Sequence, residues 1–313
     1  MDTIISSDNS FDVLVKVNHP NYKVLHRGSV YSCNTPVTFP RSAEVTERLH
    51  VGDHVQIIET GPQTGCITAV LPRRNTASRA LPLSKTGGRY QPQVLAVNLD
   101  LVVAVFAVTR PVPHWALLDR YLVMAEKAEI PVLICLTKTD LDDDGAELIE
   151  VLDNYRHIGY PSVLTSTVSG QGLNELTARL EGKISLLLGK SGVGKSSLIN
   201  ALIPESGRRT NMVGREGGKG KHTTTAAEML WMDEKSAVID SPGLREFRLW
   251  DLGTNDLAVY FPEMRPYLGQ CRFSSDCRHI EEPGCAIRQA VVNQLISPYR
   301  YQSYLKIMDD DFE

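Results

Sequence analysis

A phosphate-loop pattern constrains the fold more than any other part of this 313-residue chain: residues 189–196 read Gly-Lys-Ser-Gly-Val-Gly-Lys-Ser. An apolar run at 184–188 predicts a strand before the loop, and the apolar spacing at 198–202 predicts that a helix continues after it. In such a unit the glycines let backbone N–H groups turn towards phosphates, and the helix N-terminus favours negative charge. A glycine-rich turn without nucleotide is the alternative, but the flanking strand and helix favour a nucleotide site in an α/β domain.

Most residues of the phosphate loop have a predicted role in binding the nucleotide. Lys195 is expected to reach the β- and γ-phosphates, and the Ser196 hydroxyl is expected to bind the Mg²⁺ that accompanies the nucleotide. The remaining predicted nucleotide-binding residues of this segment are Gly189, Lys190, Ser191, Gly192, Val193, Gly194 and Ser197.

A second segment expected to contact the nucleotide begins at Asp240, directly after a later apolar run. The sequence Asp-Ser-Pro-Gly at 240–243 is by itself common in ordinary turns. Because it follows a phosphate loop, Asp240 is expected to hold Mg²⁺ through water, and the Gly243 N–H is expected to sense the γ-phosphate. Residues 217–225 are rich in glycine and lysine and end in three threonines, which is typical of a switch loop ordered by Mg²⁺ and γ-phosphate. We favour Thr224 as the Mg²⁺ ligand among them; a disordered glycine loop is the alternative.

A motif for base selection lies upstream of the phosphate loop, where residues 137–140 read Thr-Lys-Thr-Asp directly after a buried-strand pattern. The Asp140 carboxylate can accept hydrogen bonds from guanine N1–H and from its exocyclic amine, a pairing that adenine cannot offer. The alternative for Asp140 is a helix-starting aspartate. The aliphatic stem of Lys138 can cover the base, and a backbone N–H near Ser166 can meet guanine O6. The predicted base-binding residues are Thr137, Lys138, Thr139, Asp140 and Ser166.

The rest of the chain divides by its pattern. Residues 1–22 show weak periodicity and are predicted to be partly disordered, whereas short β-rich runs between residues 24 and 70 predict a small all-β barrel or sandwich. Residues 72–92, rich in Pro, Arg, Ser, Lys and Gly, are expected to form a mobile basic linker. From residue 93 to 252 strands alternate with helices, which predicts a parallel sheet covered on both faces; the remainder is helix-rich.

Composition and charge narrow the class of protein. With 42% hydrophobic and 22% charged residues the chain is unlike a disordered one, and no apolar stretch is long enough to span a bilayer. No secretory signal is visible, so a cytoplasmic location is expected. The net charge is −4, yet residues 23–89 hold nine Lys/Arg against four Asp/Glu. This excess favours a polyanion partner for that stretch, with a solvated basic face as the alternative.

Three cysteines and a histidine cluster late in the chain, with the spacing Cys271-x5-Cys277-x-His279-x5-Cys285. Three thiolates and one imidazole make a closed tetrahedral set suited to one structural Zn²⁺, with no open position for catalysis. A reduced cluster without metal is the alternative. The other cysteines are interpreted as small buried hydrophobic residues: Cys33, Cys66 and Cys135.

The order of these motifs, with the base motif first and Asp-x-Pro-Gly last, resembles that of the circularly permuted ribosome small-subunit-dependent GTPases (RsgA/YjeQ type). Further matching phrases are Val51-Gly52-Asp53, Leu71-Pro72-Arg73-Arg74, Ala96-Val97-Asn98-Leu99-Asp100, Leu118-Asp119-Arg120-Tyr121-Leu122 and Gly220-Lys221-His222-Thr223-Thr224. The resemblance covers roughly residues 24–308. It implies an OB-fold RNA-binding domain at 23–92, a circularly permuted α/β phosphate-loop GTPase domain at 93–252, and a mainly helical zinc-binding domain at 253–313.

The resemblance also implies an activity and partners. It implies hydrolysis of GTP to GDP and phosphate, stimulated by the small (30S) ribosomal subunit late in its maturation, with binding to 16S rRNA and dissociation after hydrolysis. It further implies a monomer without a membrane partner. The aromatic residues Tyr31, Phe39 and Tyr90 are candidates for stacking on RNA in an OB-fold, with core packing as the alternative.

Catalysis is expected to differ from that of GTPases that use a glutamine after the glycine of this Asp motif, because Leu244 stands at that position and cannot orient water. The resemblance points to His222 in the switch loop as the water-positioning residue beside the catalytic Lys195; an exposed loop histidine is the alternative.

Thr137 stands where the family has asparagine, so lower guanine affinity and selectivity are expected. Two other functions stay open: a phosphate-loop ATPase or GTPase with relaxed base selectivity acting on another RNA, and a binding module that has lost hydrolysis.

Overall fold

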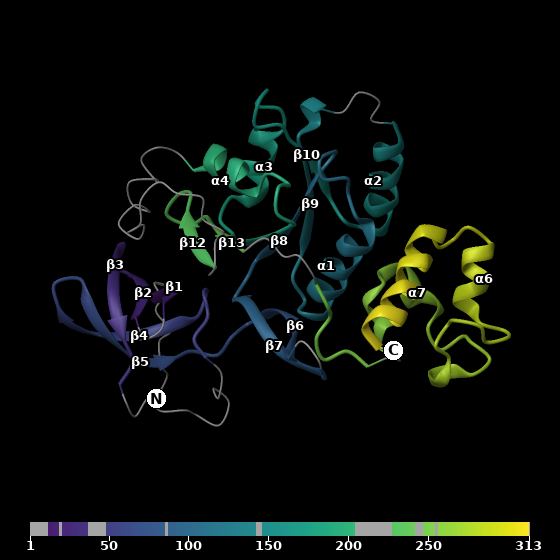
Figure 1. Cartoon of the computed structure of the whole chain (residues 1–313), viewed down its shortest axis with the longest axis horizontal. Coiled ribbons are helices and arrows are strands. Elements are labelled where there is room, and N and C mark those ends of the chain that lie inside the picture. Colours follow the sequence, from purple (N-terminus) through teal and green to yellow (C-terminus); the bar gives the residue numbers. More distant parts are fainter. Residues whose placement is uncertain are drawn as a thin grey trace, which may run out of the picture.

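Three structural regions follow one another along the chain: a β-barrel, a mostly parallel sheet with helices on both faces, and a C-terminal group of short helices (Figure 1). The barrel and the C-terminal helices lie on opposite sides of the sheet region. The computed structural model describes residues 12–18, 21–36, 48–84, 87–141, 146–203, 227–241, 247–253 and 256–312. None of the helices in these ranges combines the length and the apolar character that crossing a bilayer requires.

The central sheet has the predicted alternation of strands and helices. Five parallel strands lie in the order β10, β9, β8, β11, β13, and β12 pairs antiparallel with β13. These strands are β8 (Leu101–Ala107), β9 (Val132–Thr137), β10 (Ser162–Leu164), β11 (Ile184–Leu188), β12 (Glu228–Trp231) and β13 (Ala237–Asp240). Because the parallel strands run in one direction, the loops that follow them gather at one edge of the sheet.

Alternate residues of the buried strands face two different helix layers. The helices are α1 (Trp115–Lys127), α2 (Ala146–Ile158), α3 (Leu173–Leu180) and α4 (Lys195–Leu202). On β8, Val102 belongs to the core cluster that includes α1 and α2, whereas its neighbour Val103 belongs to the cluster that includes α3 and α4. Burial on both faces explains why these strands read as continuous apolar runs.

The N-terminal strands close a five-strand barrel in the order β1, β2, β3, β5, β4, with a further pairing between β1 and β4. They are β1 (Asp12–Asn18), β2 (Asn21–His26), β3 (Ser29–Asn34), β4 (His54–Gly61) and β5 (Thr64–Val70). Leu14, Val24 and Ile67 are fully buried inside it. Within the segment expected to be partly disordered, residues 12–18 and 21–22 form strands, because β1 is held by pairing with β2, β4 and β12 rather than by a local pattern.

Residues 76–97 include a hairpin where composition suggests a mobile basic linker. β6 (Thr76–Ser84) pairs antiparallel with β7 (Gly87–Val97). Pro82 and Pro92 argue against strands in the sequence, but each strand of a two-stranded ribbon has a free edge at which proline is tolerated. Arg79 Nε donates to Gln93 Oε1 across the ribbon at 2.7 Å. The linker expectation was therefore wrong, and part of its basic charge is used inside the hairpin.

The C-terminal region is helix-rich, as predicted, and packs against the α1 face of the sheet. Its elements are η2 (Leu257–Tyr260), η3 (Pro262–Tyr267), η4 (Ser274–Asp276), α6 (Ala286–Val292) and α7 (Pro298–Phe312). Phe261, Met264, Tyr304 and Ile307 are almost completely buried in the same cluster as residues of α1. The C-terminal helices and the sheet therefore share one hydrophobic core.

Candidate nucleotide site and metal centre

The predicted nucleotide-binding segments meet at the carboxyl edge of the parallel sheet. The phosphate loop joins β11 to α4, and the 137–140 motif begins at the last residue of β9. Ser166 follows β10, and Asp240 ends β13, where it pairs with Leu187 of β11. Segments that are far apart in sequence are thus brought to the edge at which open α/β sheets bind their ligands.

The phosphate loop lies tightly against β8 and encloses the Lys195 side chain. A Cβ at Gly189 would lie 2.4 Å from the carbonyl oxygen of Val105, so a larger residue would collide with the backbone there. Gly194 precedes α4 with a φ of 99°, a conformation that favours glycine. The Lys195 ammonium donates to the carbonyl oxygens of Gly189 at 2.5 Å and Lys190 at 3.3 Å. The loop backbone therefore fixes the ammonium at the start of α4.

The electrostatics of the loop follow from this burial. Burial lowers the pKa of Lys195 from its usual 10.5, and the charge of the Asp240 carboxylate partly opposes that shift. The side chains of Ser191, Ser196 and Ser197 are exposed. The loop therefore combines one enclosed cation with accessible hydroxyls at the helix start.

Thr137 connects β9 to the phosphate loop. Its hydroxyl donates to the carbonyl oxygen of Val193 at 2.5 Å and lies 3.2 Å from the carbonyl oxygen of Phe106. All three residues are buried. Threonine at this position therefore keeps a hydrogen bond to the loop, although its single hydroxyl provides no amide for a base.

Lys138 joins the base motif to two loops. Its ammonium donates to the carbonyl oxygen of Gly192 at 2.7 Å and to that of Arg110 at 2.5 Å. The segment around Arg110, between β8 and α1, was not predicted to belong to the site. No residue type marks this role in the sequence, because the contact uses a backbone carbonyl oxygen.

Asp140 is held in place by Ser166. The Ser166 hydroxyl donates to the Asp140 carboxylate at 2.5 Å and accepts from the backbone N–H groups of Val168 at 3.2 Å and Ser169 at 3.1 Å. Ser166 is buried, whereas Asp140 is exposed. The Thr139 hydroxyl donates to the Gln171 side-chain oxygen at 3.1 Å. The arrangement presents a fixed carboxylate to solvent at the sheet edge, as guanine recognition would require.

Several predicted residues cannot be compared with the structure. His222, Thr224 and Gly243 lie outside the described residues, as do Leu244 and Phe39.

The four predicted metal ligands are brought together in the C-terminal region. Their ligand atoms all lie within 4.8 Å of one another, and all four residues are buried: Cys271, Cys277, His279 and Cys285. The Sγ atoms of Cys271 and Cys285 are 3.8 Å apart, and His279 Nδ1 is 3.5 Å and 3.4 Å from them. A tetrahedral site with Zn–S of about 2.3 Å and Zn–N of about 2.0 Å has edges of about 3.8 Å and about 3.5 Å. Cys271, Cys285 and His279 are therefore spaced as in a tetrahedral zinc site, and with Cys277 beside them the cluster could hold a zinc ion.

Backbone and side chains around the cluster hold its loop. The N–H groups of Ala286 and Arg288 point to Sγ of Cys271 at 3.3 Å and Sγ of Cys285 at 3.5 Å. The Tyr301 hydroxyl of α7 donates to the His279 carbonyl oxygen at 2.7 Å. The five residues between Cys271 and Cys277 therefore do not keep the four ligands apart.

Comparison with known proteins identifies the family. A family model described as RsgA GTPase matches residues 70–250, more than half of the chain. The chain belongs to the RsgA GTPase family. A relative from Gemmatimonas aurantiaca, named small ribosomal subunit biogenesis GTPase RsgA, is 40% identical over 286 residues, which cover 91% of each chain. A relative of the same name from Pseudomonas aeruginosa is 42% identical over 272 residues, covering 83% of this chain and 78% of the relative.

Two solved structures are similar over nearly the whole chain. YjeQ from Thermotoga maritima superposes with a TM-score of 0.73 at 31% identity, covering 96% of this chain and 97% of that one. YloQ, described as a circularly permuted GTPase, has a TM-score of 0.71 at 28% identity, covering 96% and 93%. The expected RsgA/YjeQ resemblance and the architecture of barrel, permuted GTPase domain and C-terminal helices are confirmed.

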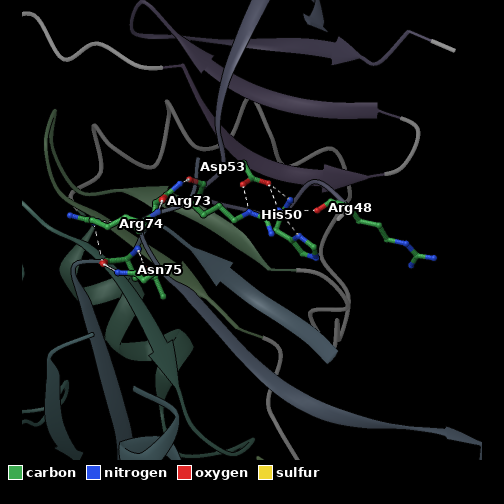
Figure 2. A network of polar contacts seen from close by, with 9 residues as sticks. Arg48, His50, Asp53, Arg73, Arg74 and Asn75 are labelled. Carbon is green, nitrogen blue, oxygen red and sulfur yellow. Dashed lines mark hydrogen bonds and ion pairs between the residues drawn. The ribbon is translucent and has the colours of Figure 1, made fainter. Parts of the chain in front are cut away.

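Three of the segments that carry the resemblance to the RsgA family meet at the junction between the barrel and the sheet, which Figure 2 shows from close by. They are residues 51–53, 71–74 and 96–100. The fully buried Asp53 carboxylate accepts from Arg73 Nε at 2.7 Å, from a second guanidinium nitrogen of Arg73 at 3.0 Å, and from the His50 N–H at 2.8 Å. Because a bidentate pair of this kind satisfies both charges, Arg73 is a structural residue of the junction.

The junction continues to the strand that leads into the phosphate loop. Asn98 accepts from the Arg74 N–H at 2.7 Å and donates to the Gly52 carbonyl oxygen at 2.9 Å. Asp100 accepts from the Arg74 guanidinium at 2.7 Å and from the Ile184 N–H, at the start of β11, at 2.8 Å. The basic stretch was interpreted as favouring a polyanion partner, but the charges of Arg73 and Arg74 are paired within the RsgA-family fold.

Proposed function

We propose that this chain hydrolyses GTP to GDP and phosphate under stimulation by the small (30S) ribosomal subunit, acts late in the maturation of that subunit, and dissociates after hydrolysis. The names of its relatives and of its family support this proposal. The observation that carries the guanine assignment is the exposed Asp140 carboxylate, which the Ser166 hydroxyl holds at 2.5 Å. A carboxylate in that setting can accept both N–H groups of guanine.

The roles proposed for the site follow from its charges. Lys195 counters the charge of the β- and γ-phosphates, and the N–H groups of residues 189–197 line the phosphates. Ser196 and Thr224 bind Mg²⁺, which neutralises charge on the phosphates when bound. Asp240 orients water around that ion, and Gly243 contacts the γ-phosphate.

The remaining roles concern the base and the attacking water. Lys138 covers the base with its stem while its ammonium stays on Gly192 and Arg110. Thr137 holds the phosphate loop through its hydrogen bond to the Val193 carbonyl oxygen, and Thr139 holds the segment after β10 through Gln171. His222 positions the water that attacks the γ-phosphate.

The proposed partners and cofactors extend this assignment. The OB-fold barrel, assigned to 23–92 and extended by β1 from residue 12, binds 16S rRNA; the GTPase domain spans 93–252 and the zinc-binding domain 253–313. One structural Zn²⁺ is held by Cys271, Cys277, His279 and Cys285. The protein acts as a monomer in the cytoplasm.

Phosphate release from GTP and from ATP, with and without purified 30S subunits, tests the proposal. We expect turnover that is selective for GTP and rises strongly with the subunit. Equal use of ATP and GTP would instead support the alternative, a phosphate-loop ATPase or GTPase with relaxed base selectivity acting on another RNA, for which Thr137 is the supporting observation.

A substitution at Asp140 sharpens the test of base choice. Asp140→Asn replaces an acceptor with a donor, so it should weaken GTP binding and favour xanthosine triphosphate, whose C2 carbonyl accepts a hydrogen bond. Asp153→Asn, on the exposed face of α2 and paired with Arg156 at 2.9 Å, is the matched control and should leave both affinities unchanged. Unchanged GTP selectivity in Asp140→Asn would contradict the assignment of the base site.

A further inference from the structure

The turn that carries His279 is held by a single carboxylate. Glu282 lies three residues after His279, and its side chain accepts hydrogen bonds from three backbone N–H groups. Its Oε1 accepts from Arg278 at 2.8 Å, and its Oε2 accepts from Ile280 at 2.8 Å and from Glu281 at 3.1 Å. Because the N–H groups of residues 278 and 280 lie on either side of His279, the two oxygens of one side chain fix the path of the backbone through this predicted ligand.

His279 depends on such support because its backbone has an uncommon conformation. Its φ is 62°, in the left-handed region that residues other than glycine seldom adopt. A conformation of this kind persists only where the surrounding contacts hold it. It also sets the direction of the Cα–Cβ bond, and hence the position from which Nδ1 faces the Sγ atoms of Cys271 and Cys285. The hydrogen bonds of Glu282 therefore bear on the direction of a metal ligand.

Two tyrosines of α7 hold the carbonyl groups of the same turn. The Tyr304 hydroxyl donates to the Arg278 carbonyl oxygen at 2.7 Å, as the Tyr301 hydroxyl does to that of His279. Tyr304 is almost completely buried in the core cluster that includes α1, whereas Glu282 is only half-buried. Glu282 can therefore be replaced without opening the hydrophobic core, which makes its part in holding the turn accessible to experiment.

The surroundings of Glu282 favour its charged form. Burial on its own raises the pKa of this carboxyl group, but the hydrogen bonds from backbone N–H groups outweigh burial and hold the pKa below the usual 4.5. Hydrogen bonds to an ionised acceptor are shorter and stronger than those between neutral groups. A glutamine at this position would turn an NH₂ group towards backbone donors that need an acceptor, so fewer of these hydrogen bonds could form.

We propose that Glu282 is a positioning residue for the metal centre: its carboxylate fixes the turn at 278–281 so that His279 faces the three cysteines before a metal ion binds. This inference rests on the zinc site of the proposed function. Glu282 lies outside the group of ligand atoms, so its loss weakens metal binding through His279 and not by removing a ligand. Groups that orient a metal ligand in this way typically change metal affinity about 10- to 100-fold.

Metal titration of the full, reduced, metal-free chain tests this role. Glu282→Gln keeps the shape of the side chain and should raise the Kd for Zn²⁺, measured by competition with a chromophoric chelator, about tenfold. Glu282→Ala should raise it further. Glu281→Gln is the matched control, because it removes an equal charge from an exposed side chain of the same turn, and its Kd should stay within about twofold of the parent. Equal Kd values in Glu282→Gln and Glu281→Gln would overturn the inference.

A double-mutant cycle separates positioning of His279 from general support of the fold. Glu282→Gln should raise the Kd for Cd²⁺, which thiolates bind strongly, about tenfold in the parent. In a His279→Ala background the same change should raise it less than about twofold, because both substitutions act through one ligand. Equal losses in the two backgrounds would show that Glu282 supports the fold as a whole and would overturn the route through His279.

Cobalt provides a readout at the ligands themselves. Co²⁺ bound in place of zinc absorbs visible light with an energy and intensity that depend on the geometry of its ligands. The loaded Glu282→Gln chain should show shifted or weaker bands, whereas a change that only lowers stability leaves the spectrum of the loaded chain as in the parent. A raised Kd with an unchanged spectrum would therefore overturn the inference. This spectrum decides the question if His279→Ala binds metal too weakly for titration, and Glu282→Gln alone provides it if Glu282→Ala does not fold.

The parent chain separates this inference from the assignment on which it rests. A parent that takes up no zinc would show that the zinc site of the proposed function is wrong, and the inference would fail with it. A parent that binds one zinc ion, together with a Glu282→Gln chain that binds it equally tightly, would leave the zinc site in place and overturn the inference alone.

Discussion

Arg300 of α7 forms a buried ion pair with Asp119 of α1, and the two side chains are only 3% and 2% exposed. The same guanidinium donates to Glu263 at 2.6 Å and lies over the Phe261 ring, 4.5 Å from its centroid. The Tyr155 hydroxyl of α2 donates to Asp119 at 2.9 Å. This cluster joins the C-terminal helices to the helix layer of the sheet, so the two regions are expected to unfold together.

Removing Arg300 should therefore be strongly destabilising. Arg300→Met leaves two carboxylates buried without their cation, and breaking a buried pair in this way costs about 3–5 kcal/mol. Urea unfolding should show this loss, with one transition shifted to lower denaturant rather than two separate transitions. Arg179→Met, which removes an exposed pair on α3, should cost no more than about 0.5 kcal/mol. Equal losses in the two variants would show that the buried pair adds nothing beyond a surface pair.

The hydrogen bond from Thr137 to Val193 gives a prediction for nucleotide affinity. Thr137→Val removes the donor and leaves a buried carbonyl oxygen unpaired, which costs about 1–3 kcal/mol. We expect the affinity for GDP to fall about tenfold in a titration with a fluorescent nucleotide. Thr137→Asn keeps a donor for Val193 and adds an amide, so it should match or exceed the parent in affinity and in preference for GTP over ATP.

A threonine elsewhere provides the control for that prediction. The Thr177 hydroxyl donates to the Leu173 carbonyl oxygen at 2.9 Å on an exposed face of α3. Thr177→Val should leave the affinity for GDP unchanged. A Thr137→Val variant that binds GDP as tightly as Thr177→Val would show that the phosphate loop does not need this support.

The nucleotide-binding segments could be predicted from sequence because each depends on short-range order. A strand, a turn and a helix start place Lys195, and the direction of parallel strands brings Asp140 and Asp240 to the same edge. That these residues lie at one edge follows from the geometry of a parallel sheet, so it can be predicted without knowing individual contacts. The four metal ligands were predictable for the same reason, since their spacing is local.

The missed features depend on contacts between distant residues. β1 pairs with β12 through Lys16 and Glu228, more than two hundred positions apart, and no local pattern indicates such a pairing. Arg73 belongs to the basic excess of residues 23–89, but its partner Asp53 is fully buried, and burial of a charge pair is visible only in three dimensions. Arg300 was missed because its role arises from the packing of α7 against α1.

The cysteine cluster predicts that purified protein contains one zinc ion per chain. Cys277→Ser should lose that zinc in elemental analysis, whereas Cys66→Ser, in the barrel and outside the cluster, should retain it. Structural zinc contributes directly to folding energy, so we expect Cys277→Ser or treatment with a chelator to lower Tm by about 10 °C or more. A Cys277→Ser variant with full zinc content would contradict the assignment of this ligand.

The lowered pKa of Lys195 predicts a pH dependence with a definite sign. Burial disfavours the ammonium in the folded protein, so the folded pKa lies below the value of 10.5 expected when unfolded. Between those two pKa values the unfolded chain binds more protons, and the free energy of unfolding of the nucleotide-free protein should rise with pH. Urea unfolding of the parent and of Lys195→Met over an alkaline pH series isolates this contribution, because other groups cancel in the difference.

Nucleotide should reverse that behaviour. Phosphates stabilise the ammonium, so the pKa of Lys195 should rise when GDP is bound, and binding should take up protons at pH values between the free and the bound pKa. The ¹³Cε resonance of Lys195, assigned by its absence in Lys195→Met, reports both pKa values directly. A stability difference between parent and Lys195→Met that stays constant up to pH 10.5 would show that burial does not penalise this charge. A resonance that titrates identically with and without GDP would show that the ammonium does not meet the phosphates.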